Sequence, residues 1–137
     1  MNRLVPVSLI CLLATGAFAG TPTDEAFGNL ADEYLNDLAN FSPTTATIIG
    51  DHRADDELDR VDDAARAESL ELLREYQAAL EALDRGELSR ANQVDAELLL
   101  HEIESSIWSL ETLREWAWNP LYYVNISGSA IYGLLAR

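Results

Sequence analysis

The sequence predicts an all-α fold, with a signal peptide at residues 1–19 followed at 20–137 by an antiparallel helical bundle. Apolar residues recur at steps of three and four over most of the chain, which is the spacing of amphipathic helices. Prolines or capping side chains precede these periodic segments. The apolar stretch at 130–137 has no closing glycine and no polar tail. We therefore expect a bundle that is truncated before the rest of a larger helical fold.

Residues 1–19 have the pattern of an export signal. A short positive start precedes an apolar run at 4–18, and a small-x-small cleavage site follows at 17–19. The run is shorter than the roughly 20 residues that span a bilayer. Cys11 lies in the middle of this run rather than just after it, which argues against a lipoprotein. We expect cleavage after Ala19 and a periplasmic or extracellular product.

The charge of the chain excludes several classes of partner. The formal net charge is −15, and cleavage of the signal would remove one arginine and no acid, giving −16. All 9 basic residues are arginine. Nucleic acids and anionic lipids are bound by clustered basic side chains, so this field repels them. We predict no nucleic-acid partner and no membrane contact once the signal is removed.

The first predicted helix begins at Thr21, which can cap it, and Pro22 suits its first position. Acidic side chains line one side, and the other side carries Phe27, Leu30, Tyr34, Leu35, Leu38 and Phe41. Ser42-Pro43 restarts the pattern as the cap and first residue of a short helix. Gly50 can end that helix in the left-handed conformation.

The acidic segment 54–61 is predicted as a surface loop, or as a short helix held by a pair of Asp56 with Arg60. The clearest long helix begins at the acidic pair 62–63 and ends at Gly86. Its apolar seam consists of Leu70, Leu73, Tyr76, Leu80 and Leu83.

Ser89 caps the next long helix, which is predicted to run to about Trp116. Its apolar seam consists of Val94, Leu98, Leu99, Ile103, Ile107, Leu110 and Leu113. Because only a short turn joins the two long helices, we expect them to lie antiparallel as a hairpin.

Asn119-Pro120 interrupts the helical pattern, since the residue before a proline disfavours the helical region. Residues 121–126 are aromatic and β-branched, and this composition predicts an extended segment or an irregular buried crossing. A turn is expected at 127–129, and an apolar helix at 130–137.

The chain holds no reaction centre that its motifs reveal. His101-Glu102 opens the zinc-peptidase pattern H-E-x-x-H, but Ser105 stands where the second histidine is needed. His52 is the only other histidine, and catalytic zinc usually has three protein ligands. The acidic run 51–63 lacks the alternation and the internal glycine of a calcium loop. We predict no catalytic residue, no cofactor site and no metal ligand here.

Two groups of residues are candidates to face a substrate. In the turn 50–53, His52 and Arg53 lie together, and a guanidinium can hold a substrate carboxylate by a two-pronged hydrogen bond. The alternative is a structural turn in which Asp51 bonds its own backbone and Arg53 pairs with nearby acids. The second group consists of Trp118, Tyr122 and Tyr123. These aromatic residues either line a cleft that clamps a peptide or pack in the core.

Four stretches, at 30–35, 42–53, 94–99 and 114–124, have an order and spacing that resembles the opening of the bacterial family called domain of unknown function 885. The resemblance implies an exported, mostly helical protein several times longer than this chain. Family members look like gluzincin-type zinc peptidases, whose H-E-x-x-H pair would lie far beyond residue 137. No catalytic residue of the family can be carried onto this chain.

The resemblance implies a role for the helices, which would form one wall of a substrate cleft. The partners would be the remainder of the same fold beyond Arg137 and a peptide substrate, with zinc in the full-length protein. A second function class stays open: a stand-alone secreted helical binding module without enzymatic activity. The uncapped apolar ending at 130–137 favours the first class.

Overall fold

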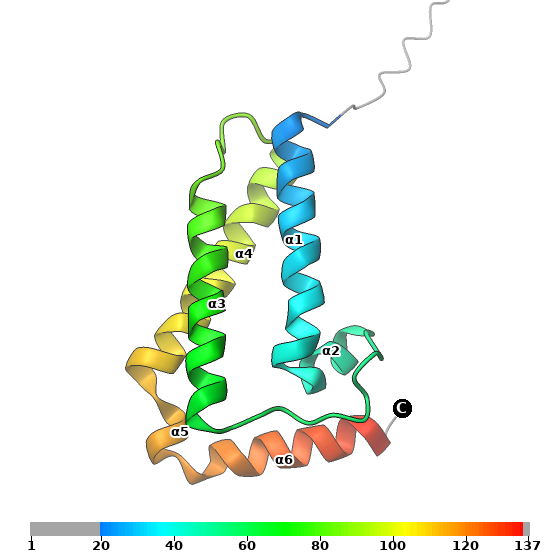
Figure 1. Cartoon of the computed structure of the whole chain (residues 1–137), viewed down its shortest axis with the longest axis vertical. Coiled ribbons are helices and arrows are strands. Elements are labelled where there is room, and N and C mark those ends of the chain that lie inside the picture. The colour runs from blue at the N-terminus through cyan, green and yellow to red at the C-terminus, as the bar shows by residue number, and fades with distance from the viewer. Residues whose placement is uncertain (1–19, 136–137) are drawn as a thin grey trace, which may run out of the picture.

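The computed structural model describes residues 20–135, and every regular element in that range is helical (Figure 1). The elements are α1 Pro22–Phe41, α2 Pro43–Ile49, α3 Asp63–Glu81, α4 Arg90–Trp108, the π-helix η1 Ser109–Leu113, α5 Glu115–Trp118 and α6 Pro120–Leu135. The predicted all-α class is confirmed. The signal peptide predicted at 1–19 lies outside the described residues. Of these helices, none is long and apolar enough to cross a membrane.

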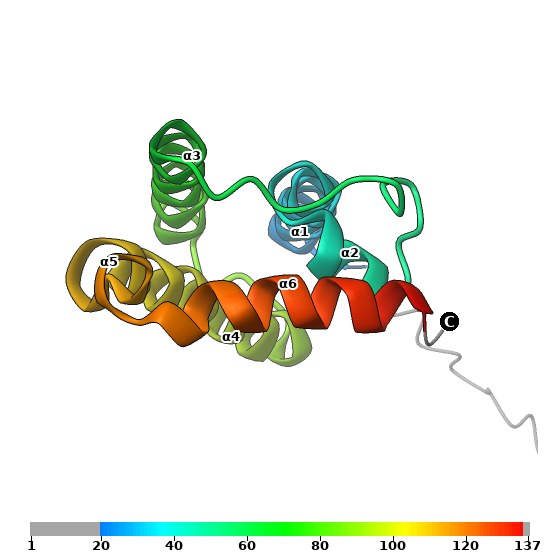
Figure 2. The ribbon, with the colours of Figure 1, turned by 90° about the horizontal axis from the view of Figure 1, so that it is seen from below.

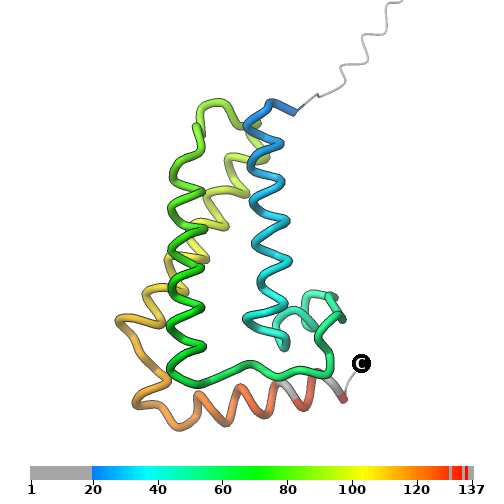
Figure 3. The backbone as a smooth tube through the Cα atoms, in the orientation of Figure 1, coloured from blue at the N-terminus to red at the C-terminus, as the bar shows by residue number. Residues whose placement is uncertain are grey.

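Three helices form a bundle, and a fourth crosses one end of it. Helices α1 and α4 run in the same direction, with α3 antiparallel to both, so the predicted α3–α4 hairpin is confirmed (Figure 1). The segment between α2 and α3 runs across the lower end of the bundle (Figure 3). Helix α6 lies across that same end and contacts α2 and α5 (Figure 2).

The core lies between α1, α3 and α4. Ile103 has no exposed surface and Leu80 is 2% exposed. They form one cluster with Phe27, Tyr76, Leu88 and Ala96. Two members of the predicted α4 seam, Val94 and Leu98, are instead exposed. The buried stripe of α4 runs through Ala96, Leu99, Leu100, Ile103 and Ile107, which turns the neighbouring stripe of Val94 and Leu98 outward.

The starts of α1 and α4 are joined through one carboxylate. Thr21 and Asp24 form a capping box, in which each side chain accepts the other's backbone N–H at 3.0 Å. Asp24 Oδ1 also accepts from the backbone N–H of Ser89 and from Asn92 Nδ2, both at 2.8 Å. These hydrogen bonds, with that from the Ser89 backbone foremost, lower the pKa of Asp24 to about 2. The predicted cap at Thr21 is thus confirmed and extended into a tertiary contact.

Helix α2 is capped by a residue distant in the sequence rather than by the residue that precedes the helix. The predicted cap Ser42 makes no side-chain cap bond to the helix. Asp59, in the acidic loop, accepts from the backbone N–H of Thr44 at 3.1 Å and from its hydroxyl at 2.6 Å. The loop alternative for 54–61 is therefore confirmed, and Arg60 pairs with Glu68 at 2.9 Å instead of with an acid of its own segment.

Three predicted boundaries are wrong. Helix α3 ends at Glu81 rather than at Gly86. Gly86 lies in the turn that follows, where its backbone N–H donates to Asp84 Oδ1 at 2.9 Å. Helix α4 ends at Trp108 and passes into the π-helix η1, so it does not reach Trp116. Residues 121–129 are neither extended nor a turn, because α6 runs through all of them.

The start of α6 explains the last of these errors. Pro120 occupies the first helical position, where its missing N–H costs nothing. Asn119 is extended, and its side-chain oxygen accepts from the backbone N–H of Leu121 at 3.0 Å. The Asn-Pro corner thus ends one helix and begins another, and β-propensity in the following residues is too weak to override this start.

Candidate functional site

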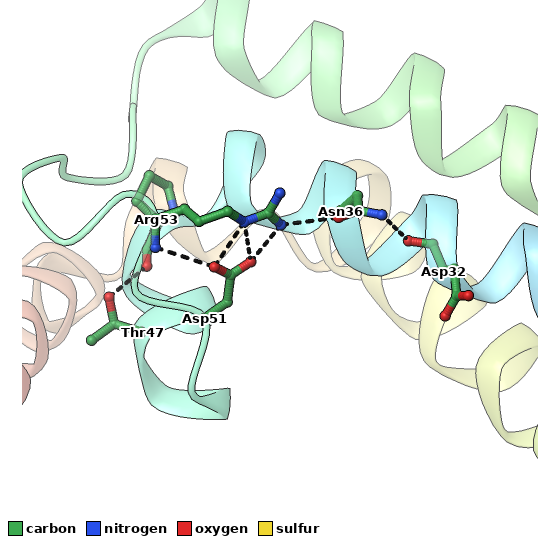
Figure 4. A network of polar contacts seen from close by, with 6 residues as sticks. Asp32, Asn36, Thr47, Asp51 and Arg53 are labelled. Carbon is green, nitrogen blue, oxygen red and sulfur yellow. Dashed lines mark hydrogen bonds and ion pairs between the residues drawn. The ribbon is translucent and has the colours of Figure 1, made fainter.

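The turn after α2 is held against α1 by a polar network (Figure 4). Gly50 adopts φ +98°, so it ends α2 in the left-handed conformation as predicted. Arg53 Nη2 donates to Asp51 Oδ2 at 2.6 Å, and its Nε donates to Asp51 Oδ1 at 2.9 Å. The backbone N–H of Arg53 also donates to Asp51 Oδ1, at 3.1 Å. Through Nη2, the guanidinium reaches Asn36 Oδ1 on α1 at 3.1 Å.

This pairing decides what Arg53 offers to a ligand. The hydrogen bond from Arg53 lowers the pKa of Asp51 to about 2, so the carboxylate is ionised at neutral pH. The guanidinium fork is therefore already occupied by an anion. A groove of about 520 Å³ beside it is lined by Asp32, Leu35, Asn36, Ile49, Gly50, Asp51 and Arg53. A substrate carboxylate entering there would compete with Asp51 and meet a second acid, Asp32.

His52 lies in the same turn and faces its own acid. Its Nδ1 is 3.0 Å from Asp55 Oδ2, and the imidazole is largely exposed. His52 and Arg53 therefore each have a carboxylate partner within the loop, which is the arrangement expected of a structural turn. A substrate-facing role for either side chain stays a prediction.

The aromatic candidates lie at the junction of α5 and α6. Trp118 is 62% exposed, and its indole Nε1 donates to the carbonyl of Leu113 at 2.9 Å. The rings of Tyr122 and Tyr123 meet edge to face, with centroids 5.2 Å apart. Burial, and then the neighbouring Tyr123, raise the pKa of Tyr122. Tyr123 donates its hydroxyl proton to the carbonyl of Trp116 at 2.9 Å, which ties α6 to α5.

The two candidate groups do not meet. The turn 50–53 follows α2, which lies toward the C-terminal end of α6, whereas the aromatic group lies where α6 begins (Figures 1 and 2). A groove of about 280 Å³ runs between the acidic loop and α6. It is lined by Leu58, Asp59, Val61, Tyr123, Ile126, Ser127 and Ile131. Of the predicted residues, Tyr123 lines this groove.

Sequence reasoning missed an arrangement around Trp116. Two guanidiniums lie over the Trp116 indole, with Arg66 Cζ 4.1 Å and Arg114 Cζ 5.0 Å from the ring centroid, and we call this group the Trp116 stack. Its Nε1 donates to the carbonyl of Leu110 at 3.3 Å. Arg66 comes from α3, far away in the sequence, so no local spacing could have indicated this stack.

Within residues 20–135, no three His, Cys, Asp or Glu side chains are grouped so that they could hold a metal ion. His101 lies exposed on α4, and Ser105 occupies the next turn of the same helix. The described residues therefore do not fit a catalytic zinc centre.

More than half of the chain matches a family of bacterial proteins. The family model described as "Bacterial protein of unknown function (DUF885)" matches residues 43–136, which is more than half of the chain. The matched range includes both candidate groups and the Trp116 stack. Among curated proteins and among solved structures, no match to this chain is found.

Proposed function

Because the chain belongs to the DUF885 family of bacterial proteins, we propose that it is the N-terminal, non-catalytic portion of an exported zinc-dependent peptidase. In this proposal, its helices form one wall of a substrate cleft, and the remainder of the same fold covers the apolar side of α6. The zinc ligands and the general base belong to parts of the longer protein beyond Arg137.

The observation that carries the proposal is the composition and exposure of α6. No charged residue occurs between Pro120 and Leu135, in a chain with 24 acidic residues. Five of its large apolar side chains are more than half exposed: Leu121, Val124, Ile131, Tyr132 and Leu135. A large exposed apolar patch marks an interaction site, and an uncharged helix with so many exposed apolar side chains is typical of one that another surface covers.

Further protein is a better cover for α6 than a lipid surface. Interfacial membrane helices carry basic residues on their polar face, and α6 has none. The acidic loop beside it, with Asp56, Glu57 and Asp59, would be repelled by anionic headgroups. Family membership favours the rest of the same polypeptide as the covering partner.

The test compares this chain with the full-length product of its gene. We expect the full-length protein to hydrolyse an unblocked peptide library, to lose that activity with a chelator and to regain it with zinc, while this chain alone is inactive. Hydrogen exchange should show the amides of α6 protected in the full-length protein and exposed in this chain. A full-length protein without chelator-sensitive hydrolysis would contradict the peptidase part, and unprotected α6 amides would contradict the packing part.

The alternative is a stand-alone secreted binding module without enzymatic activity. The same uncharged α6 and the groove lined by Leu58 and Ile126 suit an apolar partner on a separate chain. A reading frame that ends at Arg137, together with a monomeric, reversible unfolding transition of the isolated chain, would favour this alternative over the peptidase.

A further inference from the structure

The Trp116 stack brings two cations, Arg66 and Arg114, to the same aromatic ring. Arg66 lies over one part of the α5 indole at 4.1 Å, and Arg114 lies at 5.0 Å from the same centroid. Guanidiniums favour this position over an indole face because the ring quadrupole attracts them. A guanidinium held over a ring in this way can keep N–H donors available for a carboxylate.

The backbone holds Arg114 in this place at a cost. Arg114 has φ 51° and ψ 43°, the left-handed conformation that L-residues other than glycine rarely adopt. The preceding π-helix ends here, with the Arg114 N–H donating to the carbonyl of Ser109 at 2.9 Å. The indole bonds of Trp116 and Trp118 to the carbonyls of Leu110 and Leu113 lock the same corner. Single π-turns and strained residues of this kind are concentrated at functional sites.

Arg114 is also unpaired where most of its counterparts are paired. Arg53, Arg60, Arg66 and Arg74 each form an ion pair with a carboxylate. Among residues 20–135, Arg114 has neither an ion pair nor a side-chain hydrogen bond, although acids outnumber basic residues in the chain by 24 to 9. Arg114 is an exposed residue, and its side-chain donors are free for a ligand.

We propose that Arg114, on its Trp116 platform, binds the terminal carboxylate of a short peptide. The fork of Arg114 would hold both carboxylate oxygens. Trp118 borders the site because its indole Nε1 donates to the carbonyl of Leu113, the residue before Arg114. Its exposed ring offers a surface for the last side chain of the peptide. The peptide nature of the ligand rests on the proposed function, whereas the carboxylate site itself does not.

This assignment differs from the one that the sequence suggests. Both Arg53 and Arg114 present a guanidinium, but Asp51 already occupies the fork of Arg53. Arg114 has an aromatic platform and no competing acid in the described structure. The free fork is therefore the better receptor for an incoming carboxylate.

The experiment is a titration of the isotopically labelled chain, followed through the indole N–H signals of Trp116 and Trp118. The probe is N-acetyl-alanyl-phenylalanine with a free carboxylate, and its C-terminal amide is the control. We expect saturable shifts of both indoles with the acid and none with the amide. Equal shifts with both compounds, or no saturation at millimolar concentration, would overturn the proposal.

Three variants sharpen the result. Arg114→Asn removes the guanidinium while asparagine tolerates the left-handed conformation, so binding should weaken tenfold or more with the fold intact. Arg114→Lys keeps the charge but loses the fork, and should weaken binding by an intermediate factor. Arg85→Gln, an exposed arginine in the α3–α4 turn, should bind as the original chain does. Unchanged binding in Arg114→Asn or Arg114→Lys would refute the site, and inactivity of the full-length protein would leave this titration unaffected.

Discussion

The left-handed conformation of Arg114 predicts an inverted order of two substitutions. In a helix interior, glycine is less stable than alanine by about 1 kcal/mol. At Arg114 we expect the reverse, because glycine adopts φ 51° without a steric penalty and alanine does not. The perturbation is therefore the pair Arg114→Gly and Arg114→Ala, compared with each other and with the original chain.

The magnitude follows from three terms. The left-handed conformation costs an L-residue roughly 1–2 kcal/mol, which Arg114→Gly relieves and Arg114→Ala retains. Glycine loses about 0.5–1 kcal/mol more conformational entropy on folding than alanine. Both variants lose the exposed cation–π contact with Trp116, which contributes about 0.5–1 kcal/mol. We therefore expect Arg114→Ala to destabilise the fold by about 0.5–1 kcal/mol and Arg114→Gly to leave it nearly unchanged.

Urea unfolding followed by circular dichroism measures this difference. A small domain has a slope of about 1–3 kcal/mol per molar urea, so the glycine midpoint should exceed the alanine midpoint by roughly 0.2–1 M. Ala78→Gly, on the exposed side of α3, is the matched control and should cost about 1 kcal/mol. If glycine is also less stable than alanine at position 114, the residue is not left-handed and the strain argument fails.

Three further predictions concern the core, acid stability and metal binding. Ile103→Ala should lower the free energy of unfolding by about 2–5 kcal/mol because the side chain is fully buried. Leu98 is 63% exposed on the same helix, so Leu98→Ala should change the free energy of unfolding by less than about 0.5 kcal/mol. The urea midpoints of the two variants measure this difference. The pKa of Asp24 in the folded protein is about 2, below its ordinary 3.8. The ionised carboxylate therefore stabilises the fold at pH values above 3.8, and this stabilisation is lost as the pH falls through 2. Asp24→Asn should therefore lose less stability between pH 5 and pH 2, measured by urea midpoints at each pH, and an unchanged slope would show that Asp24 is not linked to folding. After dialysis, metal analysis of this chain should find no stoichiometric zinc, and a bound zinc that disappears in His101→Ala would contradict this.

The elements that the sequence predicted correctly are those set by nearby residues. The cap and proline at the start of α1, the left-handed Gly50 and the apolar spacing of α3 are all local properties of the chain. They depend on contacts within a few residues, so the pattern suffices to place them. The hairpin of α3 and α4 follows in turn from the short connection between them.

Two of the errors come from contacts between distant segments. The predicted continuation of α4 to Trp116 fails because the stack with Arg66 and the indole bond to Leu110 stabilise a π-turn instead. Asp59 replaces the expected local cap of α2, and no spacing rule links a loop acid to a helix start fifteen residues earlier. In these two cases a tertiary contact overrides the local preference, whereas the error at 121–129 comes from the local helix start at Pro120.

The candidate site shows the same division. Sequence reasoning identified both the turn at Arg53 and the aromatic corner, and it stated the ion-paired alternative for the turn. The sequence did not indicate which guanidinium is already paired with an acid. The pairing of Arg53 with Asp51 depends on the turn that the left-handed Gly50 produces. The unpaired guanidinium of Arg114 could not be predicted either, because its position depends on its contact with the Trp116 ring.

The topology also sets an order of events during folding. Helices α3 and α4 meet through a short turn, and closing a short loop is fast, so this hairpin should form first. Helix α2 precedes the hairpin in the chain and α6 follows it, so their contact closes a long loop. This contact should therefore form late. Until then, α6 lacks its contact with α2, and its exposed apolar side chains can associate with other chains. Its amide hydrogens should accordingly exchange through partial openings that leave the three-helix bundle intact.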